Sequence, residues 1–307
     1  MIADALRKSH GKYYIYAGGA TTNKVWKIDP SGMSKVAESA DLGGAINAIT
    51  SDGIYIYAGG GSANRMYKID LTNMSTVDYT DAYGGGIRRA VLVDGYLYFG
   101  GVTTQKVWKV DTSDMSKTAE SADLGRSIQG ITELGDYIYA SMYGSGRVYK
   151  LAKSDLSTIG YYSYSSSDNV YAVTSDGTYL YCGGWTAETV DQFNTSLSLV
   201  DDLSYGGPIR ALTSDGTYIY AGGNDTLKVY KIDPSNMTKA AESASISSGI
   251  IASLHFDGKY LYAALSSPQT VWKIDPSDMS KVDESASYGG DLAAVYSDNP
   301  NRWARSN

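Results

Sequence analysis

Few side chains in this chain of 307 residues could carry out catalysis. There are two histidines, His10 and His255, whereas a histidine-based metal site or a Ser-His-Asp arrangement needs several reactive groups in one place. Asp168 and Asp291 could form a carboxylate pair for glycosidic chemistry, which requires a separation of about 5 to 10 Å. The repeat described below places them three units apart, which is too far. We therefore expect no enzyme active site, no metal site and no cofactor.

A second group of side chains is better suited to binding than to catalysis. It occupies one point of the repeat, where two other copies carry alanine, and consists of Asn47, Arg89, Gln129, Tyr171 and Arg210. Guanidinium groups bind carboxylates through paired hydrogen bonds, so an anion or a carboxylate-bearing sugar is the expected ligand. The alternative is that these strand starts are simply solvated, because pocket residues are normally few.

A third group is aromatic. Tyr143 and Trp185 stand where most other copies carry small or polar residues such as Gly61, and Tyr171 lies between them in the chain. Together these three rings would make a stacking platform for a sugar ring or an anchor for a protein loop. The alternative is that they cover the seam between two repeat units, although exposed aromatic patches often mark contact sites.

A repeat of about forty residues positions these side chains. The motif Tyr-hydrophobic-Tyr occurs seven times, at intervals of 39 to 42 residues, and begins at Tyr14, Tyr55, Tyr96, Tyr137, Tyr179, Tyr218 and Tyr260. One copy is too short to bury its own apolar faces, so each copy must pack against its neighbours.

The second copy shows what one unit contains. Residues 46–50 form a first strand, and the pair Asp52-Gly53 predicts a tight turn into a second strand at residues 55–60. Residues 66–70 and 75–79 form the third and fourth strands. Each unit is therefore expected to be a four-stranded antiparallel sheet.

Residues that recur in every copy are interpreted as scaffold. The turn between the third and fourth strands carries an apolar residue that should plug the sheet, namely Met33, Met74, Met115, Leu156, Leu197, Met237 and Met279. The lysines are spread at one or two per copy and are interpreted as solvated strand ends.

The two ends of the chain predict a closed ring. Residues 292–298 read as a first strand without a hairpin partner, while the strand near Tyr14 reads as a second strand. Pairing them completes one sheet and removes exposed edges. We expect an all-β seven-bladed β-propeller over residues 12–298, closed by the C-terminal strand, with a lead-in segment at 1–11 and a tail at 299–307.

The order of these motifs resembles a known family. An apolar-Tyr strand, a polar loop, Val-x-x-Ile-Asp as at Val229 to Asp233, and a later Asp-Gly turn are similar to the YVTN-type β-propeller repeat, while Gly-Gly after the second strand resembles kelch repeats. The resemblance covers residues 12–298 and implies a propeller found in surface-layer and other cell-surface proteins. It implies no particular activity, because propellers host unrelated functions.

The composition of the chain excludes some classes of binding partner. A net charge of −7 and an isoelectric point near 4.9 argue against nucleic acid, which is bound through clustered Lys and Arg. The sequence contains no run of about eighteen apolar residues, so we expect no membrane insertion. Met1 to Lys8 lacks the apolar stretch of a secretion signal.

These features predict a non-enzymatic recognition or structural module with a glycan or protein ligand on one face. Tyr, Ser, Gly and Asn are frequent in its expected loops, as in adaptable binding surfaces. We expect an extracellular-type location, on a cell surface or on a virus particle as an attachment or decoration protein within a larger assembly. An intracellular protein-interaction scaffold, with a cytoplasmic location, is the first alternative, and a propeller-type hydrolase or lyase is the second.

Overall fold

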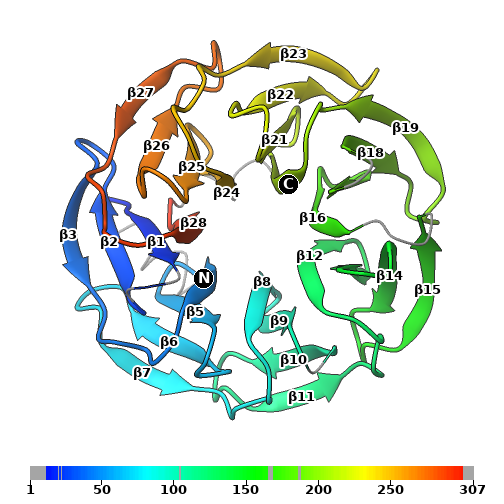
Figure 1. Cartoon of the computed structure of the whole chain (residues 1–307). Coiled ribbons are helices and arrows are strands. Elements are labelled where there is room, and N and C mark those ends of the chain that lie inside the picture. The colour runs from blue at the N-terminus through cyan, green and yellow to red at the C-terminus, as the bar shows by residue number, and fades with distance from the viewer. Residues whose placement is uncertain are drawn as a thin grey trace.

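The computed structural model describes residues 12–299 except for 20, 22, 104, 165–168 and 186–187. Within this part, the chain forms seven four-stranded antiparallel sheets arranged as blades around a central channel (Figure 1). The prediction of an all-β seven-bladed propeller is confirmed. The expected lead-in at 1–11 and residues 300–307 of the expected tail lie outside the described residues.

Every blade has the same strand order from the channel outward. The innermost strands are β28 (Leu292–Ser297), β4 (Ile46–Ser51), β8 (Ile87–Val93), β12 (Ile128–Leu134), β16 (Val170–Ser175), β20 (Ile209–Ser214) and β24 (Ile251–Phe256), which belong to blades 1 to 7 in that order. The second strands are β1 (Ile15–Gly19), β5 (Tyr55–Gly60), β9 (Tyr96–Gly101), β13 (Tyr137–Met142), β17 (Leu180–Gly184), β21 (Ile219–Gly223) and β25 (Leu261–Leu265). The third strands are β2 (Val25–Asp29), β6 (Met66–Asp70), β10 (Val107–Asp111), β14 (Arg147–Ala152), β18 (Thr189–Phe193), β22 (Tyr230–Asp233) and β26 (Val271–Ile274). The outer strands are β3 (Ser34–Glu38), β7 (Thr76–Tyr79), β11 (Lys117–Glu120), β15 (Thr158–Ser163), β19 (Leu199–Ser204), β23 (Thr238–Glu242) and β27 (Lys281–Glu284).

Blade 1 closes the ring by joining the two ends of the propeller. Strand β28 pairs antiparallel with β1, with Tyr296 opposite Tyr16. The half-buried carboxylate of Asp298 accepts hydrogen bonds from the backbone N–H of Tyr14 at 2.6 Å and from the hydroxyl of Tyr16 at 3.0 Å. Tyr296 also donates to the carbonyl of Ser51 in blade 2, at 3.1 Å. The predicted pairing of the C-terminal strand with the N-terminal blade is confirmed.

The second tyrosine of each repeated motif is fully buried between blades. In blades 2, 5 and 6 the tyrosine hydroxyl donates to the aspartate of the tight turn, as Tyr57 does to Asp52 at 2.9 Å. In blade 3 the equivalent turn position is Val93, and the hydroxyl of Tyr98 instead donates to the carbonyl of Lys153 in blade 4 at 2.9 Å. A hydroxyl with such a partner allows a tyrosine to replace phenylalanine in the core. In blade 7 the buried hydroxyl of Tyr262 has no hydrogen-bond partner among the described residues.

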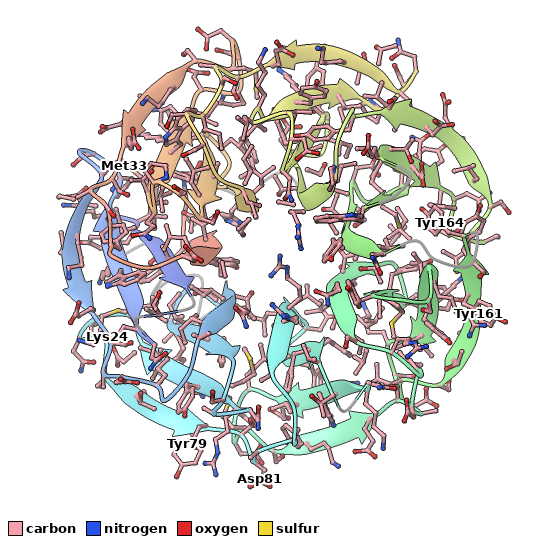
Figure 2. All side chains as sticks on the ribbon, in the orientation of Figure 1. Lys24, Met33, Tyr79, Asp81, Tyr161 and Tyr164 are labelled. Carbon is pink, nitrogen blue, oxygen red and sulfur yellow. The ribbon has the colours of Figure 1, made fainter. Side chains whose placement is uncertain are left out.

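The apolar plugs of the outer turns are buried in all seven blades. Met33, for example, is only 1% exposed and lies at the periphery of blade 1 (Figure 2). Its backbone φ of 49° lies in the left-handed region, and the other six plugs share this conformation. Burial of a large apolar side chain stabilises a fold by about 1.5 to 3 kcal/mol, which offsets the cost of about 1 to 2 kcal/mol for the left-handed backbone. The scaffold interpretation of these residues is confirmed.

A polar side chain from each third strand joins one blade to the next. Its nitrogen donates to a carbonyl in the outer turn of the following blade at 2.5 to 3.1 Å, in the pairs Lys27 to Leu71, Lys68 to Thr112, Lys109 to Lys153, Lys150 to Thr195, Gln192 to Pro234, Lys231 to Pro276 and Lys273 to Pro30. Lys27, Lys68 and Lys273 are buried. The interpretation of these lysines as solvated strand ends is therefore wrong, because their partners belong to another copy of the repeat.

Replacing Lys273 by methionine should lower the free energy of unfolding by about 2 kcal/mol, because a charged hydrogen bond across the ring closure is lost and a buried carbonyl is left unpaired. Lys273 Nζ lies 2.8 Å from the Pro30 carbonyl and 4.1 Å from the centre of the Tyr260 ring. Chemical denaturation measures the loss. Lys273→Gln is the matched control, since Gln192 makes the same bond in blade 5. Equal losses in the two variants would contradict this explanation.

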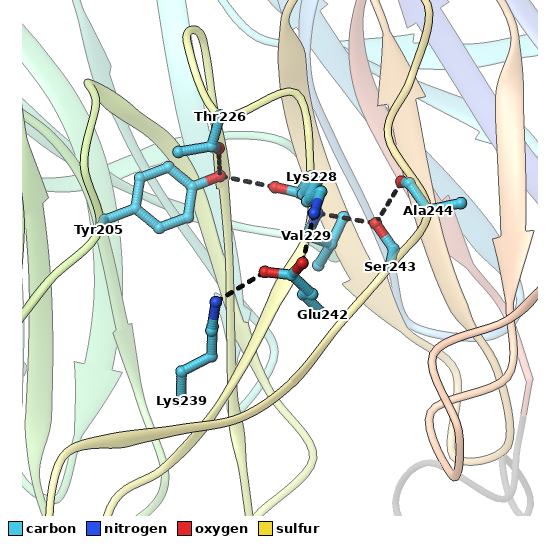
Figure 3. Close-up of polar contacts among 8 residues, drawn as sticks. All are labelled: Tyr205, Thr226, Lys228, Val229, Lys239, Glu242, Ser243 and Ala244. Carbon is cyan, nitrogen blue, oxygen red and sulfur yellow. Dashed lines mark hydrogen bonds and ion pairs between the residues drawn. The ribbon is translucent and has the colours of Figure 1, made fainter.

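The outer strands of four blades carry charged clusters. In blade 6, Glu242 binds both Lys228 and Lys239, and Ser243 accepts a hydrogen bond from the backbone of Val229 (Figure 3). In blades 1 and 3, the corresponding lysines lower the pKa of Glu38 and of Glu120 to about 2. Exposed pairs of this kind contribute little stability. Their charges instead protect the edge strands from pairing with other chains.

Candidate binding site at the channel mouth

The central channel is a cavity of about 1020 Å³ lined by residues from all seven innermost strands. These strands begin on one side of the ring, where Arg89 and Arg210 line the cavity, and end on the other, where Asp94 and Glu133 line it. The channel therefore has a basic end and an acidic end. We call the basic end, at the strand starts, the mouth.

A β-bulge at the start of each innermost strand sets which side chains lie at the mouth. The register shifts after the first residue of the strand, and the extra residue is Ala293, Asn47, Arg88, Gln129, Tyr171, Arg210 or Ala252 in blades 1 to 7. A bulge redirects its side chain and is frequent near functional sites.

The placement of Arg89 at this level is corrected. Arg88 is the bulge residue of blade 3, and Arg89 pairs with Gly100 as Ala48 pairs with Gly59 in blade 2. In the repeat, an alanine followed by an apolar residue comes directly after the bulge, as Ala48-Ile49 does in blade 2. In β8 arginine replaces that alanine, so the alignment slipped by one position.

Arg89 extends across the channel one residue deeper than the bulge. Its Nη1 donates to the carbonyls of Asn47, at 3.1 Å, and of Arg88, at 3.0 Å. Its Nη2 donates to the carbonyl of Ala252 in blade 7, at 3.3 Å. Burial, together with the nearby charges of Arg88 and Arg210, lowers the pKa of Arg89 to about 10. Arg89 therefore stays positively charged at neutral pH and forms a cationic floor beneath the mouth.

Three aromatic rings and one arginine form a contiguous group on one sector of the mouth. The ring centroids of Tyr143 and Tyr171 lie 5.8 Å apart, and those of Tyr171 and Trp185 are also 5.8 Å apart. The guanidinium carbon of Arg210 lies 4.1 Å from the Tyr171 ring and 4.7 Å from the Trp185 ring. We call these four residues the aromatic patch. The structure thus brings together four of the seven side chains singled out in the sequence.

The patch is partly open to solvent. Tyr143 is 45% exposed and Trp185 is 37% exposed. Tyr171 is half-buried, and this burial raises the pKa of its hydroxyl while Arg210 opposes the rise. The Tyr171 hydroxyl is therefore neutral near pH 7. Tyr143 and Trp185 present ring surface to a ligand.

Asn169 holds the loops that carry the patch, and the sequence comparison missed it. Its side-chain oxygen accepts a hydrogen bond from the backbone of Gly144 at 2.7 Å, and its carbonyl accepts one from the backbone of Trp185 at 2.8 Å. It thereby fixes the residue next to Tyr143 and the backbone of Trp185. The sequence does contain a signal for Asn169. The residue directly before the innermost strand is Ala45, Gly86 or Ser127 in blades 2 to 4, and in blade 5 it is an asparagine, whose side-chain amide can form hydrogen bonds.

The remaining predicted residues lie at the mouth but outside the patch. Asn47 is half-buried and donates to the carbonyl of Ile87 at 3.3 Å, so its amide supports the neighbouring strand. Gln129 is half-buried and has no hydrogen-bond partner among the described residues. Within the patch, Arg210 also donates to the side chain of Asn224 at 3.3 Å, which fixes the orientation of the guanidinium group.

The described residues contain no group of three or more His, Cys, Asp and Glu side chains placed to hold a metal ion. His255 lies in the channel wall and stacks on Tyr296, with ring centroids 4.5 Å apart. Asp291 is exposed, and Asp168 lies outside the described residues. The part of the chain seen in the structure also has no helix that is long and apolar enough to cross a membrane.

Comparison with solved structures matches 1543 chains. One of them is the WD40 β-propeller domain of Doa1, with a TM-score of 0.67, a sequence identity of 10%, and coverage of 80% of this chain and 85% of that chain. The likeness shows the fold alone. No protein-family model and no curated protein matches this chain, so its resemblance to YVTN-type and kelch repeats stays a prediction.

Proposed function

We propose that this propeller is a non-enzymatic recognition module that binds a glycan through the aromatic patch at the channel mouth. The observation that carries the proposal is the mutual contact of Tyr143, Tyr171, Trp185 and Arg210 in a partly exposed group. Ring faces provide apolar surface for the C–H faces of a sugar, while the tyrosine hydroxyls and Arg210 supply hydrogen bonds.

The patch has the properties of a prepared site rather than of a seam between blades. Arg210 is held against two rings, and each cation–π contact limits the motion of the side chains involved. Asn169 and the backbone of the inner strands hold the loops in place. A rigid group loses little conformational entropy when a ligand binds, which raises affinity.

Glycans are displayed on the outside of cells and of many virus particles. We propose such a surface as the place of action, in line with the loop composition of the chain. A protein loop that inserts an apolar side chain into the patch is the competing ligand class. A glycan array distinguishes the two, because a protein ligand gives no sugar signal.

Trp185→Ala should weaken glycan binding at least tenfold, because a partly exposed tryptophan in a cluster of rings has the character of a binding hot spot. A glycan array followed by titration of any positive sugar measures the effect. Tyr79→Ala is the matched control, since Tyr79 is 51% exposed on β7 at the outer rim (Figure 2). Thermal unfolding should change little in either variant. An unchanged sugar signal in Trp185→Ala would reject this site.

A further inference from the structure

We infer that the mouth also contains an anion site, formed by Arg88, Arg89 and Arg210, that binds a carboxylate or phosphate group of the ligand. This inference rests on the proposed function, because it names the charge of the ligand at the same mouth. The sequence comparison placed two arginines at one level. The structure instead places Arg88 and Arg210 at that level and Arg89 beneath them.

The three arginines lack a counter-charge among the described residues. Several lysines elsewhere in the chain form ion pairs with carboxylates. Lys153, for example, pairs with Asp94 at 3.3 Å and with Glu133 at 3.2 Å. None of Arg88, Arg89 and Arg210 forms an ion pair within the described part of the chain. Asp94 and Glu133 also line the channel, but at its acidic end.

Like charges at a partly enclosed site raise the local positive potential. Burial, together with the charges of Arg88 and Arg210, lowers the pKa of Arg89. Removing charges from water is costly unless an opposite charge compensates. A bound anion supplies that compensation, and the positive field at the mouth would draw it in.

The hydrogen-bond donors indicate where the anion sits. Arg89 uses its guanidinium on three backbone carbonyls, so it acts mainly as a fixed charge. The side chain of Arg88 is exposed and has no partner in the described residues, so all five of its N–H groups are available. Arg88 can therefore form the paired hydrogen bonds that carboxylates and phosphates accept.

The position of Arg210 joins the anion site to the aromatic patch. Its guanidinium contacts the rings of Tyr171 and Trp185. Its positive charge also repels that of Arg89 and so contributes to the lowered pKa of Arg89. A sugar stacked on the patch would place an acidic substituent toward the arginines. Acidic sugars and phosphorylated sugars share this chemistry.

The inference is tested with glucuronate, glucose and inorganic phosphate at constant ionic strength. Binding is measured by titration calorimetry and by the shift in melting temperature. We expect glucuronate or phosphate to bind the wild-type protein at least tenfold more tightly than glucose, and Arg88→Gln to remove this difference. Glucuronate binding would identify a sugar carboxylate as the source of the charge, and phosphate binding without glucuronate binding would identify a phosphate group.

Arg65→Gln is the matched control, because it removes the same charge from a side chain stacked on Tyr79 in blade 2. Arg88→Gln should fold normally, since this side chain holds no other residue in the described structure. Equal binding of glucose and both anions, or an anion effect equal in Arg88→Gln and Arg65→Gln, would overturn the inference. A neutral glycan that depends on Trp185 and not on Arg88 would leave the proposed function intact and reject only the anion site.

Discussion

We expect the intact chain to unfold in a single cooperative transition and a chain that ends before Leu292 not to do so. The deletion removes β28, so blade 1 keeps three strands and the inner edge of β1 is exposed. It also removes buried side chains such as Leu292 and Val295. At about 1.5 to 3 kcal/mol for each large apolar residue, the loss is at least several kcal/mol and approaches the total stability of a typical domain.

Calorimetry and hydrogen exchange would measure this effect. We expect broad melting of the deleted chain, with the fastest exchange in blades 1, 2 and 7, because β28 contacts β1, β4 and β24. A chain ending at Asn299 is the control, since it keeps β28 and the bonds of Asp298 to Tyr14 and Tyr16. If both shortened chains melt like the full chain, closure by β28 is not what holds the ring together.

The substitution Gly60→Ala should lower the free energy of unfolding by about 3 kcal/mol or more. A Cβ atom on Gly60 would lie 1.8 Å from the carbonyl oxygen of Ala45, which is backbone and cannot rotate away. The start of β4, including its bulge, would have to move, and this strain adds to any loss of packing. Chemical denaturation of the purified variant measures the effect.

Gly184→Ala is the matched control in blade 5. There the nearest atom to the new Cβ is the Asn169 carbonyl oxygen at 3.0 Å, so a small shift is enough. Met142 and Leu265 occupy the equivalent position in blades 4 and 7, which shows that the blade accepts a side chain where the backbone leaves room. Similar losses in Gly60→Ala and Gly184→Ala would mean that close approach is not the cause.

Local patterns were sufficient for predicting the blades. The Asp-Gly turns, the Tyr-hydrophobic-Tyr strands and the apolar residue of each outer turn depend on neighbours within one hairpin, so each copy of the repeat states them independently. The pairing of residues 292–298 with the strand near Tyr14 followed from counting strands. Contacts between copies were harder to predict from the sequence. Lys273 resembles a solvated strand end until the ring places Pro30 next to it.

The candidate site was likewise predicted in part from the sequence. The sequence alone singled out Tyr143, Tyr171, Trp185 and Arg210 because they differ from the other copies, and the structure shows that these four are in contact. The predicted position of Arg89 was wrong, because Arg89 stands where blade 2 has Ala48, and the following Ala90 matches the repeated alanine by sequence alone.

The sequence by itself determined a ring of seven like sheets, because strand period, turn chemistry and repeat length are local properties that recur along the chain. Only the tertiary structure decided that Arg89 crosses the channel to Ala252, that the inner lysines join successive blades, and that Asn169 fixes the aromatic patch. These contacts join residues from different blades. Their geometry exists only once the ring has closed, so no pattern within one repeat could specify them.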